Sequence, residues 1–262
     1  MKRLLTTTVT VAVLLTTNVT AYDFGSTPKT ISAHFVAPAQ TLDSVKKKLT
    51  ENGFKILSTT NIIDGHDVLA ITNDELKATN TYMAAIHVSV NGSDVRVQNP
   101  SYLGAAFLGD KYKYGQFKAT VNALEKALGS LKGSKQKTDF SDLEDYNFMM
   151  GMPKVDDTIT VKEGKDLASK VSDAAYTLTL PNGNVIVGHK LSKKTNKFLK
   201  TLNEENNAQI LPYESMVSGD EAQILDPKFY LALSLPNLSM GQFMEIASVP
   251  DDIETEITKA YK

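Results

Sequence analysis

Apolar and polar positions fall into two series along the chain, and each series ends in a related segment. Residues 99–117 and 226–243 both open with Asn or Asp before Pro, continue with aromatic and Leu residues, and close on Gly-Gln-Phe. A segment that returns in altered form indicates one supersecondary unit used twice. The pattern therefore predicts two related halves.

In the first half, runs rich in β-branched residues predict strands, and apolar residues at helical spacing predict helices. A helix is expected to start after Thr41, a good N-cap, and to stop at Asn52-Gly53. The turn Asn91-Gly92-Ser93, between apolar runs at 85–90 and 94–98, predicts a hairpin. The other strands are expected at 30–37, 54–60 and 68–72, and further helices at 100–107 and 116–131.

The second half follows the same course with shorter pieces. Its strands are expected at 158–161, 176–180, 185–187, 209–217 and 222–225, and its helices at 164–172, at 191–202 and after Pro227. Met240 and Met244, at i and i+4, are expected in the core. The predicted class is α+β, with two similar repeats, each a mainly antiparallel sheet with helices packed on it. The first repeat is assigned to residues 22–131, a polar linker to 132–155 and the second repeat to 156–262.

The N-terminus has the pattern of a secretory signal peptide. Lys2 and Arg3 precede an uncharged, Thr-rich apolar core at residues 4–19, and Val19-Thr20-Ala21 supplies the small residues of a cleavage site. We expect cleavage after Ala21, so that residues 1–21 take no part in the fold. The alternative, a retained membrane anchor, is disfavoured because the core is short and diluted by Thr.

The composition limits the cellular compartment in which the protein is expected and the chemistry that it can perform. The 262 residues contain no Cys, which excludes disulfides, thiolate catalysis, Cys-ligated zinc and a lipoprotein anchor. A Cys-free exported chain of this size fits the bacterial periplasm better than a disulfide-rich extracellular setting. Cleavage would remove two basic residues, so the formal net charge of −2 would become more negative, which argues against nucleic acid as a partner.

The order of predicted elements resembles the family called domain of unknown function 302. The first half carries the resemblance in TLDSVKKKLTENGFKIL, VLAITND and IHVSVNGSDVRVQNPSYLGAAF, and the second in VIVGHK and LPYESMVSGDEAQILDPKFYLA. The family's Leu-Pro before the hairpin is kept at Leu211-Pro212, whereas the first half has Ala84-Ala85. The resemblance implies a compact α+β fold in two divergent tandem copies, and it implies no reaction.

Four histidines and one methionine cluster are the candidates for chemistry. His66, His87 and His189 are predicted as ligand-binding residues, with a structural or surface role as the alternative, because the chain contains no HxH, HxxxH or HExxH motif. Met149, Met150 and Met152 are three thioethers within four positions. They predict either packing in an irregular gap or a site for Cu(I), the one cofactor considered.

Catalytic signatures are missing from the sequence. It contains neither a Gly-x-Ser-x-Gly elbow nor a phosphate-binding Gly-rich loop, so an enzyme is the less favoured reading. The prediction is an exported, periplasmic, non-catalytic module that binds an unidentified small ligand or a periplasmic protein, without a stable membrane anchor. The alternatives are a copper-binding or redox-linked periplasmic protein, and an enzyme whose site is assembled from distant residues.

Overall fold

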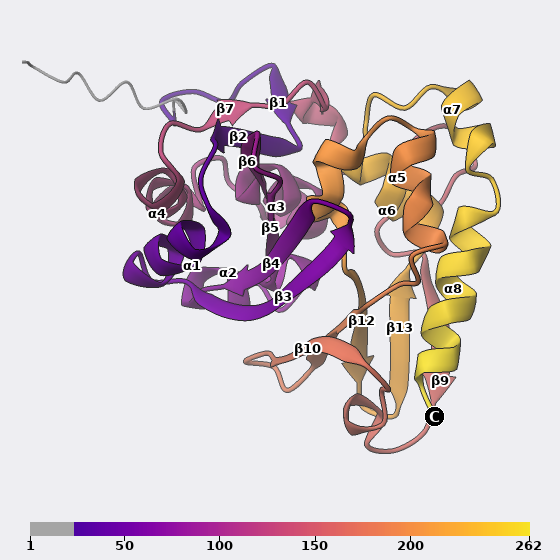
Figure 1. Ribbon diagram of the computed structural model, residues 1–262. Helices are drawn as coiled ribbons and strands as arrows, with labels where there is room; N and C mark the ends of the chain where they lie inside the picture. Colours follow the sequence, from indigo (N-terminus) through magenta and orange to yellow (C-terminus); the bar gives the residue numbers. More distant parts are fainter. Residues whose placement is uncertain (1–23) are drawn as a thin grey trace, which may run out of the picture.

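The computed structural model describes residues 24–262 and has the predicted α+β class (Figure 1). Its strands form three sheets, and each strand pair in the described range is antiparallel. The predicted signal peptide, residues 1–21, lies outside the described residues. Helices of the described range are all too short or too polar to cross a membrane.

The first half contains a six-stranded sheet. Its strand order is β3-β4-β5-β6-β2-β7. The strands are β2 (His34–Pro38), β3 (Lys55–Ile63), β4 (His66–Thr72), β5 (Ile86–Val90), β6 (Asp94–Gln98) and β7 (Lys132–Gly133). The predicted hairpin is present, because Asn91 closes the β5–β6 turn by accepting the backbone N–H groups of Ser93 and Asp94, both at 2.9 Å.

The second half contains a five-stranded sheet of order β10-β11-β12-β13-β9. The strands are β9 (Thr158–Glu163), β10 (Ala174–Thr179), β11 (Val185–His189), β12 (Tyr213–Ser218) and β13 (Glu221–Leu225). Taken in chain order, these five strands occupy the same places as β2 to β6 do in the first sheet. Two copies of one unit would give this shared order, and the duplication itself stays a prediction.

The stretch expected to be a linker, residues 132–155, contains regular structure. β7 pairs with β2, and β8 (Lys137–Asp139) pairs with β1 (Thr30–Ser32) in a separate two-stranded sheet. The predicted strand at 30–37 is therefore divided between two sheets. A short 3₁₀ helix, η3 (Phe140–Asp142), and an irregular segment then lead to β9.

Two helices open in the same way because the same local chemistry precedes them. Asn99 accepts the backbone N–H of Ser101 at 3.0 Å, and Asp226 accepts that of Lys228 at 2.8 Å. Pro then occupies the first helical turn of α3 (Pro100–Leu108) and of α6 (Pro227–Ser234). The recurring segments are thus helix starts, as Asx caps followed by Pro predict.

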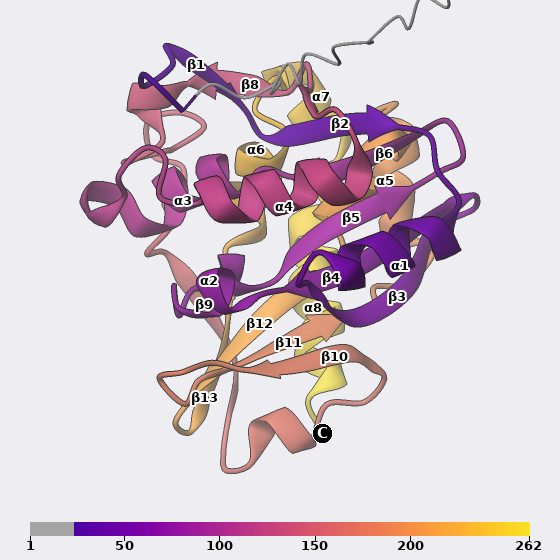
Figure 2. The same cartoon turned by 90° about the vertical axis from the view of Figure 1, so that its left-hand side faces the viewer.

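The three longest helices of the described range each pack against a strand or against another helix. α1 (Leu42–Glu51) and α4 (Lys118–Leu128) pack against each other over the first sheet (Figure 2). α8 (Val249–Ala260) packs against α6 and β9 of the second half. The other α-helices are α2 (Asp74–Lys77), α5 (Phe198–Thr201) and α7 (Met240–Glu245).

Two helices of the second half are shorter than predicted. Over 164–172 the chain forms only η4 (Leu167–Ser169), because Gly164 and Asp166 adopt positive φ angles of 142° and 56° that interrupt a helix. Over 191–202 it forms η5 (Thr195–Lys197) followed by α5. The predicted strand at 209–217 starts later, at Tyr213, after a cis Leu211-Pro212 bond.

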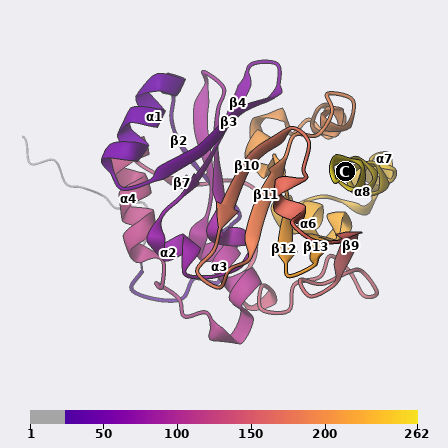
Figure 3. The ribbon, with the colours of Figure 1, turned by 90° about the horizontal axis from the view of Figure 1, so that it is seen from below.

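The halves share a continuous hydrophobic core and exchange connecting segments across their inner faces. η1 (Tyr82–Ala84), which links β4 to β5, packs against β12. In return η6 (Glu205–Ile210), which links β11 to β12, packs across β4, β5 and β6. β3 and β10 lie side by side at the same junction (Figure 3). Polar side chains of both halves therefore meet between the sheets.

Candidate functional site

Two regions of the molecule gather polar side chains from separate elements, and the first is buried between the sheets. We call it the inter-sheet cluster and define it as His87 on β5, Glu214 on β12 and Tyr176 on β10. His87 and Glu214 stand equally far before the Asn99-Pro100 and Asp226-Pro227 pairs. Residues at the same distance before these two pairs thus lie next to each other between the sheets.

The inter-sheet cluster is closely hydrogen-bonded. The His87 Nε2 atom lies 3.4 Å from Glu214 Oε1 and 3.3 Å from the Tyr176 hydroxyl, which donates a short hydrogen bond to the same carboxylate oxygen. The His87 Nδ1 atom lies 3.2 Å from the carbonyl oxygen of Gln209 in η6. Burial, and then the neighbouring Glu214 carboxylate, raise the pKa of the Tyr176 hydroxyl well above its ordinary value. Tyr176 therefore stays a neutral donor.

Gly188 on β11 gives the Tyr176 ring its place. It pairs with both Tyr176 and Glu214, and a Cβ added at Gly188 would lie 2.3 Å from the Tyr176 ring. Real Cβ atoms do not come that close, so only Gly leaves room for the ring at this position. The matching place in the first sheet, opposite His87, holds Ala70.

Space beside the inter-sheet cluster is small. A cavity of about 10 Å³ is lined by Glu214 and by Tyr82, Gln98 and Tyr230 among others. This is roughly the room that one water molecule needs, at about 10–15 Å³. The space beside the inter-sheet cluster is therefore too small for an organic ligand. The contacts of His87 with Glu214 and Tyr176 instead join the two halves.

His189 and His34 lie on other surfaces of the sheets and do not join His87. The His189 Nε2 atom is 2.7 Å from the Ser215 hydroxyl, which contacts the Tyr261 hydroxyl at 2.5 Å. Because Ser215 follows Glu214 on β12, His189 faces the opposite side of that sheet from the inter-sheet cluster. His34 donates from Nε2 to the carbonyl oxygen of Ser234 at 2.8 Å.

Burial controls the titration of these two histidines. Burial lowers the pKa of His34 to about 4. The hydrogen bond to Ser234 raises this pKa in part, and the positive charge of Arg96 lowers it further. Burial alone lowers the pKa of His189 to about 4. Both rings therefore stay neutral at pH 7 and act as packed, hydrogen-bonding groups.

His66 lies at the start of β4, half-buried and apart from the other histidines. Its Nδ1 atom is 3.2 Å from the carbonyl oxygen of Asp64, and its Nε2 atom is 3.5 Å from Asn206 Oδ1 in η6. His66, His87 and His189 thus contact three different sets of neighbours. The structure does not bring the three predicted ligand-binding histidines into one cleft.

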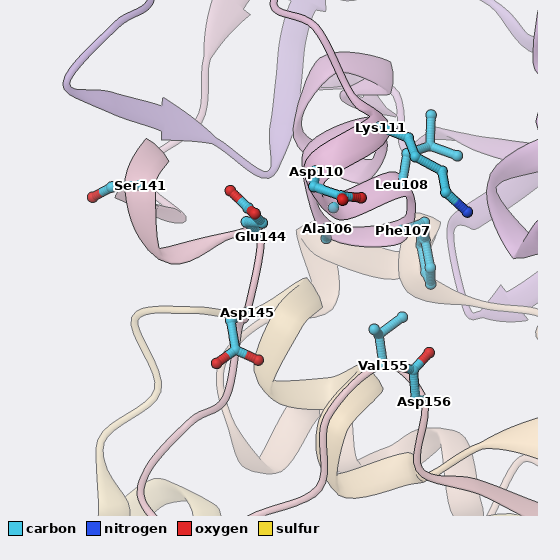
Figure 4. A pocket seen from close by; sticks show the side chains of 11 residues that line it. Ala106, Phe107, Leu108, Asp110, Lys111, Ser141, Glu144, Asp145, Val155 and Asp156 are labelled. Carbon is cyan, nitrogen blue, oxygen red and sulfur yellow. The ribbon is translucent and has the colours of Figure 1, made fainter.

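The second polar region is an open cleft beside the end of α3, with a volume of about 640 Å³. Ala106, Phe107 and Leu108 line it from α3, and Asp110 and Lys111 from the following 3₁₀ turn, η2 (Gly109–Lys111). Residues of the segment that leads to the second half complete the lining. These are Ser141, Glu144, Asp145, Val155 and Asp156. Figure 4 shows them across from the α3 end, with the Ser141 side chain turned away from it. We call this space the acid-lined cleft.

Charge in the acid-lined cleft is unbalanced. Lys154 binds Asp145 through both carboxylate oxygens, at 2.7 and 2.8 Å. Asp110, Glu144 and Asp156 form no ion pair with any residue between 24 and 262. The cleft therefore offers exposed carboxylates next to apolar surface from Phe107 and Val155, an arrangement that suits a cationic group attached to a carbon chain.

The predicted methionine cluster divides between surface and core. Met149 and Met150 are exposed, whereas Met152 is half-buried against the core and donates its backbone N–H to the Met149 carbonyl at 3.0 Å. Met240 and Met244, expected in the core, are exposed on α7. That expectation is wrong because α7 turns Phe243 inward, which leaves the i and i+4 methionines on the outer side.

Sequence reasoning missed the partners in both regions. Glu214 and Tyr176 belong to no sequence motif. The one available signal is that Glu214 precedes Asp226-Pro227 by the same distance as His87 precedes Asn99-Pro100. The cleft acids come from segments far apart in the chain, and Glu144 belonged to a stretch interpreted as solvated linker. These partners and cleft acids are recognised only once the fold places their chain segments next to each other.

Comparisons with known proteins add no relative: no family model matches the chain, and no match is found among curated proteins or solved structures. The resemblance to domain of unknown function 302 therefore stays a prediction.

Proposed function

We propose that this protein is an exported, non-catalytic binding protein whose ligand is a small organic cation held in the acid-lined cleft. The observation that carries the proposal is a set of three carboxylates, Asp110, Glu144 and Asp156, around about 640 Å³ of open space with an apolar wall. None of the three forms an ion pair with another residue of the described range. A ligand with two or more amino groups on an aliphatic chain would match the carboxylates and the wall at once. The inter-sheet cluster gives the cleft a rigid support by locking the two halves together.

The expected binding free energies favour a weak complex from which the ligand readily dissociates. An ion pair at an exposed site contributes about 0.2–1 kcal/mol, so three carboxylates contribute at most about 3 kcal/mol. Contact of the ligand's carbon chain with Phe107 and Val155 adds roughly 25 cal/mol for each Å² removed from water. Together these terms support a dissociation constant in about the millimolar to micromolar range.

Calorimetric titration with spermidine, a triamine, tests the proposal. We expect saturable binding at low ionic strength that weakens as salt is added, since exposed charges are screened within about 10 Å at 0.1 M. The double variant Asp110→Asn/Glu144→Gln should weaken binding by about tenfold, the equivalent of 1.4 kcal/mol for two exposed pairs.

A matched control removes the same charge elsewhere. Asp139→Asn/Glu163→Gln lowers the number of exposed acids equally but lies on β8 and β9, outside the cleft lining. Its affinity for spermidine should equal that of the unchanged protein. Equal loss in both double variants would show a general charge effect, and that result would contradict a specific site.

We further propose that the protein reaches the periplasm through cleavage after Ala21, and that its halves arose by duplication of a domain similar to domain of unknown function 302. Lys2, Arg3, the apolar core and the small residues at 19–21 support export, and the shared strand order supports duplication. Mass spectrometry of the purified protein should find an N-terminal peptide that begins at Tyr22. A peptide that retains Lys2 and Arg3 would contradict export by this route.

A further inference from the structure

The large hydrophobic side chains that the described chain leaves exposed are all methionines. Met150 is 99% exposed, Met244 64%, Met149 45% and Met240 42%, and no Leu, Ile, Val or Phe of residues 24–262 joins them. Four of the eight methionines of the chain are therefore the large hydrophobic residues exposed between residues 24 and 262. A surface selected only for apolar contact would use Leu, Ile and Phe as well, so the thioether sulfur is the property these positions share.

The four side chains belong to two segments that a ring contact holds together. Phe148 precedes Met149 and stacks on Phe243 of α7, with ring centroids 5.2 Å apart and planes 22° apart. Phe243 in turn precedes Met244, and Met240 lies one helical turn earlier on α7. The stacked rings thus hold the two methionine-bearing segments side by side, and we call their four exposed methionines the methionine patch. It consists of Met149, Met150, Met240 and Met244.

We propose that the methionine patch binds Cu(I) through thioether sulfurs of both segments. Soft thioether ligands favour Cu(I) over hard cations, and unbranched Met side chains on an exposed surface can turn their sulfurs toward a common ion. The chain contains no Cys, so a thiolate does not compete for the metal. Binding needs no change of oxidation state, because the ion enters and leaves as Cu(I). Met152 keeps its half-buried place under Met149 and is not among the proposed ligands.

The spacing of the ligands explains why the sequence alone indicated only half of this site. Met149 and Met150 are neighbours in a turn, whereas Met240 and Met244 follow about ninety residues later on α7. A two-coordinate site from one segment would release Cu(I) readily. Ligands from both segments close the site across the Phe148–Phe243 contact.

Competition for Cu(I) against a chromophoric chelator, under nitrogen and with the full chain, tests this inference. We expect one equivalent of Cu(I) to bind, and Met240→Leu/Met244→Leu to weaken the affinity at least about tenfold, as loss of metal-site residues does. Leu keeps the size and apolarity of Met, so the fold and any apolar docking are preserved. The control Met216→Leu changes a buried methionine on β12 and should leave the affinity unchanged.

A second measurement locates the ion. With methyl-labelled methionine, Ag(I), a redox-stable substitute for Cu(I), should shift the methyl resonances of the methionine patch and leave those of buried Met83 and Met216 in place. Absence of methyl shifts at one equivalent of Ag(I), or Cu(I) affinity in Met240→Leu/Met244→Leu equal to that of the unchanged protein, would overturn the proposal.

Discussion

The inter-sheet cluster and the acid-lined cleft both present carboxylates, but they differ in what surrounds each carboxylate. Glu214 is mostly buried, accepts a hydrogen bond from Tyr176 and lies 3.4 Å from His87. Asp110 and Glu144 are exposed and unpaired among the described residues. A paired, buried acid holds two sheets together, whereas an unpaired, exposed acid is available to a ligand. The same residue type thus joins the sheets in one region and, in our proposal, binds the ligand in the other.

The largest expected effect is a loss of stability in acid, caused by the two buried histidines His34 and His189. The pKa values of His34 and His189 are about 4 in the folded protein, below the ordinary value of 6.5. The unfolded chain therefore binds more protons between pH 6.5 and 4, and stability falls as the pH falls through this window. We expect the free energy of unfolding to decrease by about 3 to 4 kcal/mol from pH 7 to pH 5, measured by urea denaturation.

A single substitution separates the two histidines. His189→Asn keeps a hydrogen-bonding group near Ser215 and removes one titrating site, so about half of the pH dependence should remain. Stability that stays flat between pH 7 and pH 5 in the unchanged protein would contradict the description of these rings as neutral, buried groups.

The next effect tests the pairing inside the inter-sheet cluster. His87→Leu fills a similar volume but leaves Glu214 without one of its two neighbours, which should cost about 3 kcal/mol of stability, as the loss of a buried partner does. Glu214→Gln keeps an acceptor for Tyr176 and should cost only about 1 kcal/mol. Urea denaturation of both variants measures the difference. Losses below 0.5 kcal/mol in both, on the scale of ordinary surface substitutions, would show that the cluster does not join the halves.

A smaller effect is expected where Gly188 accommodates the Tyr176 ring. Gly188→Ala places a methyl group in the space of that ring, and overpacking of this kind costs about 1–3 kcal/mol. Gly241→Ala on α7 is the matched control, because the nearest atom to its added Cβ is 3.8 Å away. Thermal unfolding should show a lower midpoint for Gly188→Ala alone. Similar midpoints for both variants would mean that Tyr176 moves without cost.

Local chemistry made much of the fold predictable. The Thr41 cap, the Asn91-Gly92-Ser93 turn and the Asn99 and Asp226 helix starts each depend on residues a few positions apart, and the structure has them. The strand pairs that set the sheet order, such as β2 with β6, join residues about sixty positions apart, and the exchange of η1 and η6 between the sheets depends on contacts across more than a hundred residues. Periodicity carries no information on such contacts.

The candidate sites were less predictable for the same reason. His87 was identified, but its partner Glu214 lies on another sheet and belongs to no motif. Met149 and Met150 were identified, whereas helical spacing gave the wrong side for Met240 and Met244. Spacing shows which residues share a face, and only packing shows whether that face meets the core.

The most direct test of the binding proposal is a map of amide shifts in ¹H–¹⁵N spectra during titration with spermidine. We predict saturable shifts at Asp110, Glu144, Val155 and their neighbours, with His87 and Glu214 unmoved. Absence of saturable shifts, or shifts gathered at the inter-sheet cluster instead of the cleft, would contradict the account.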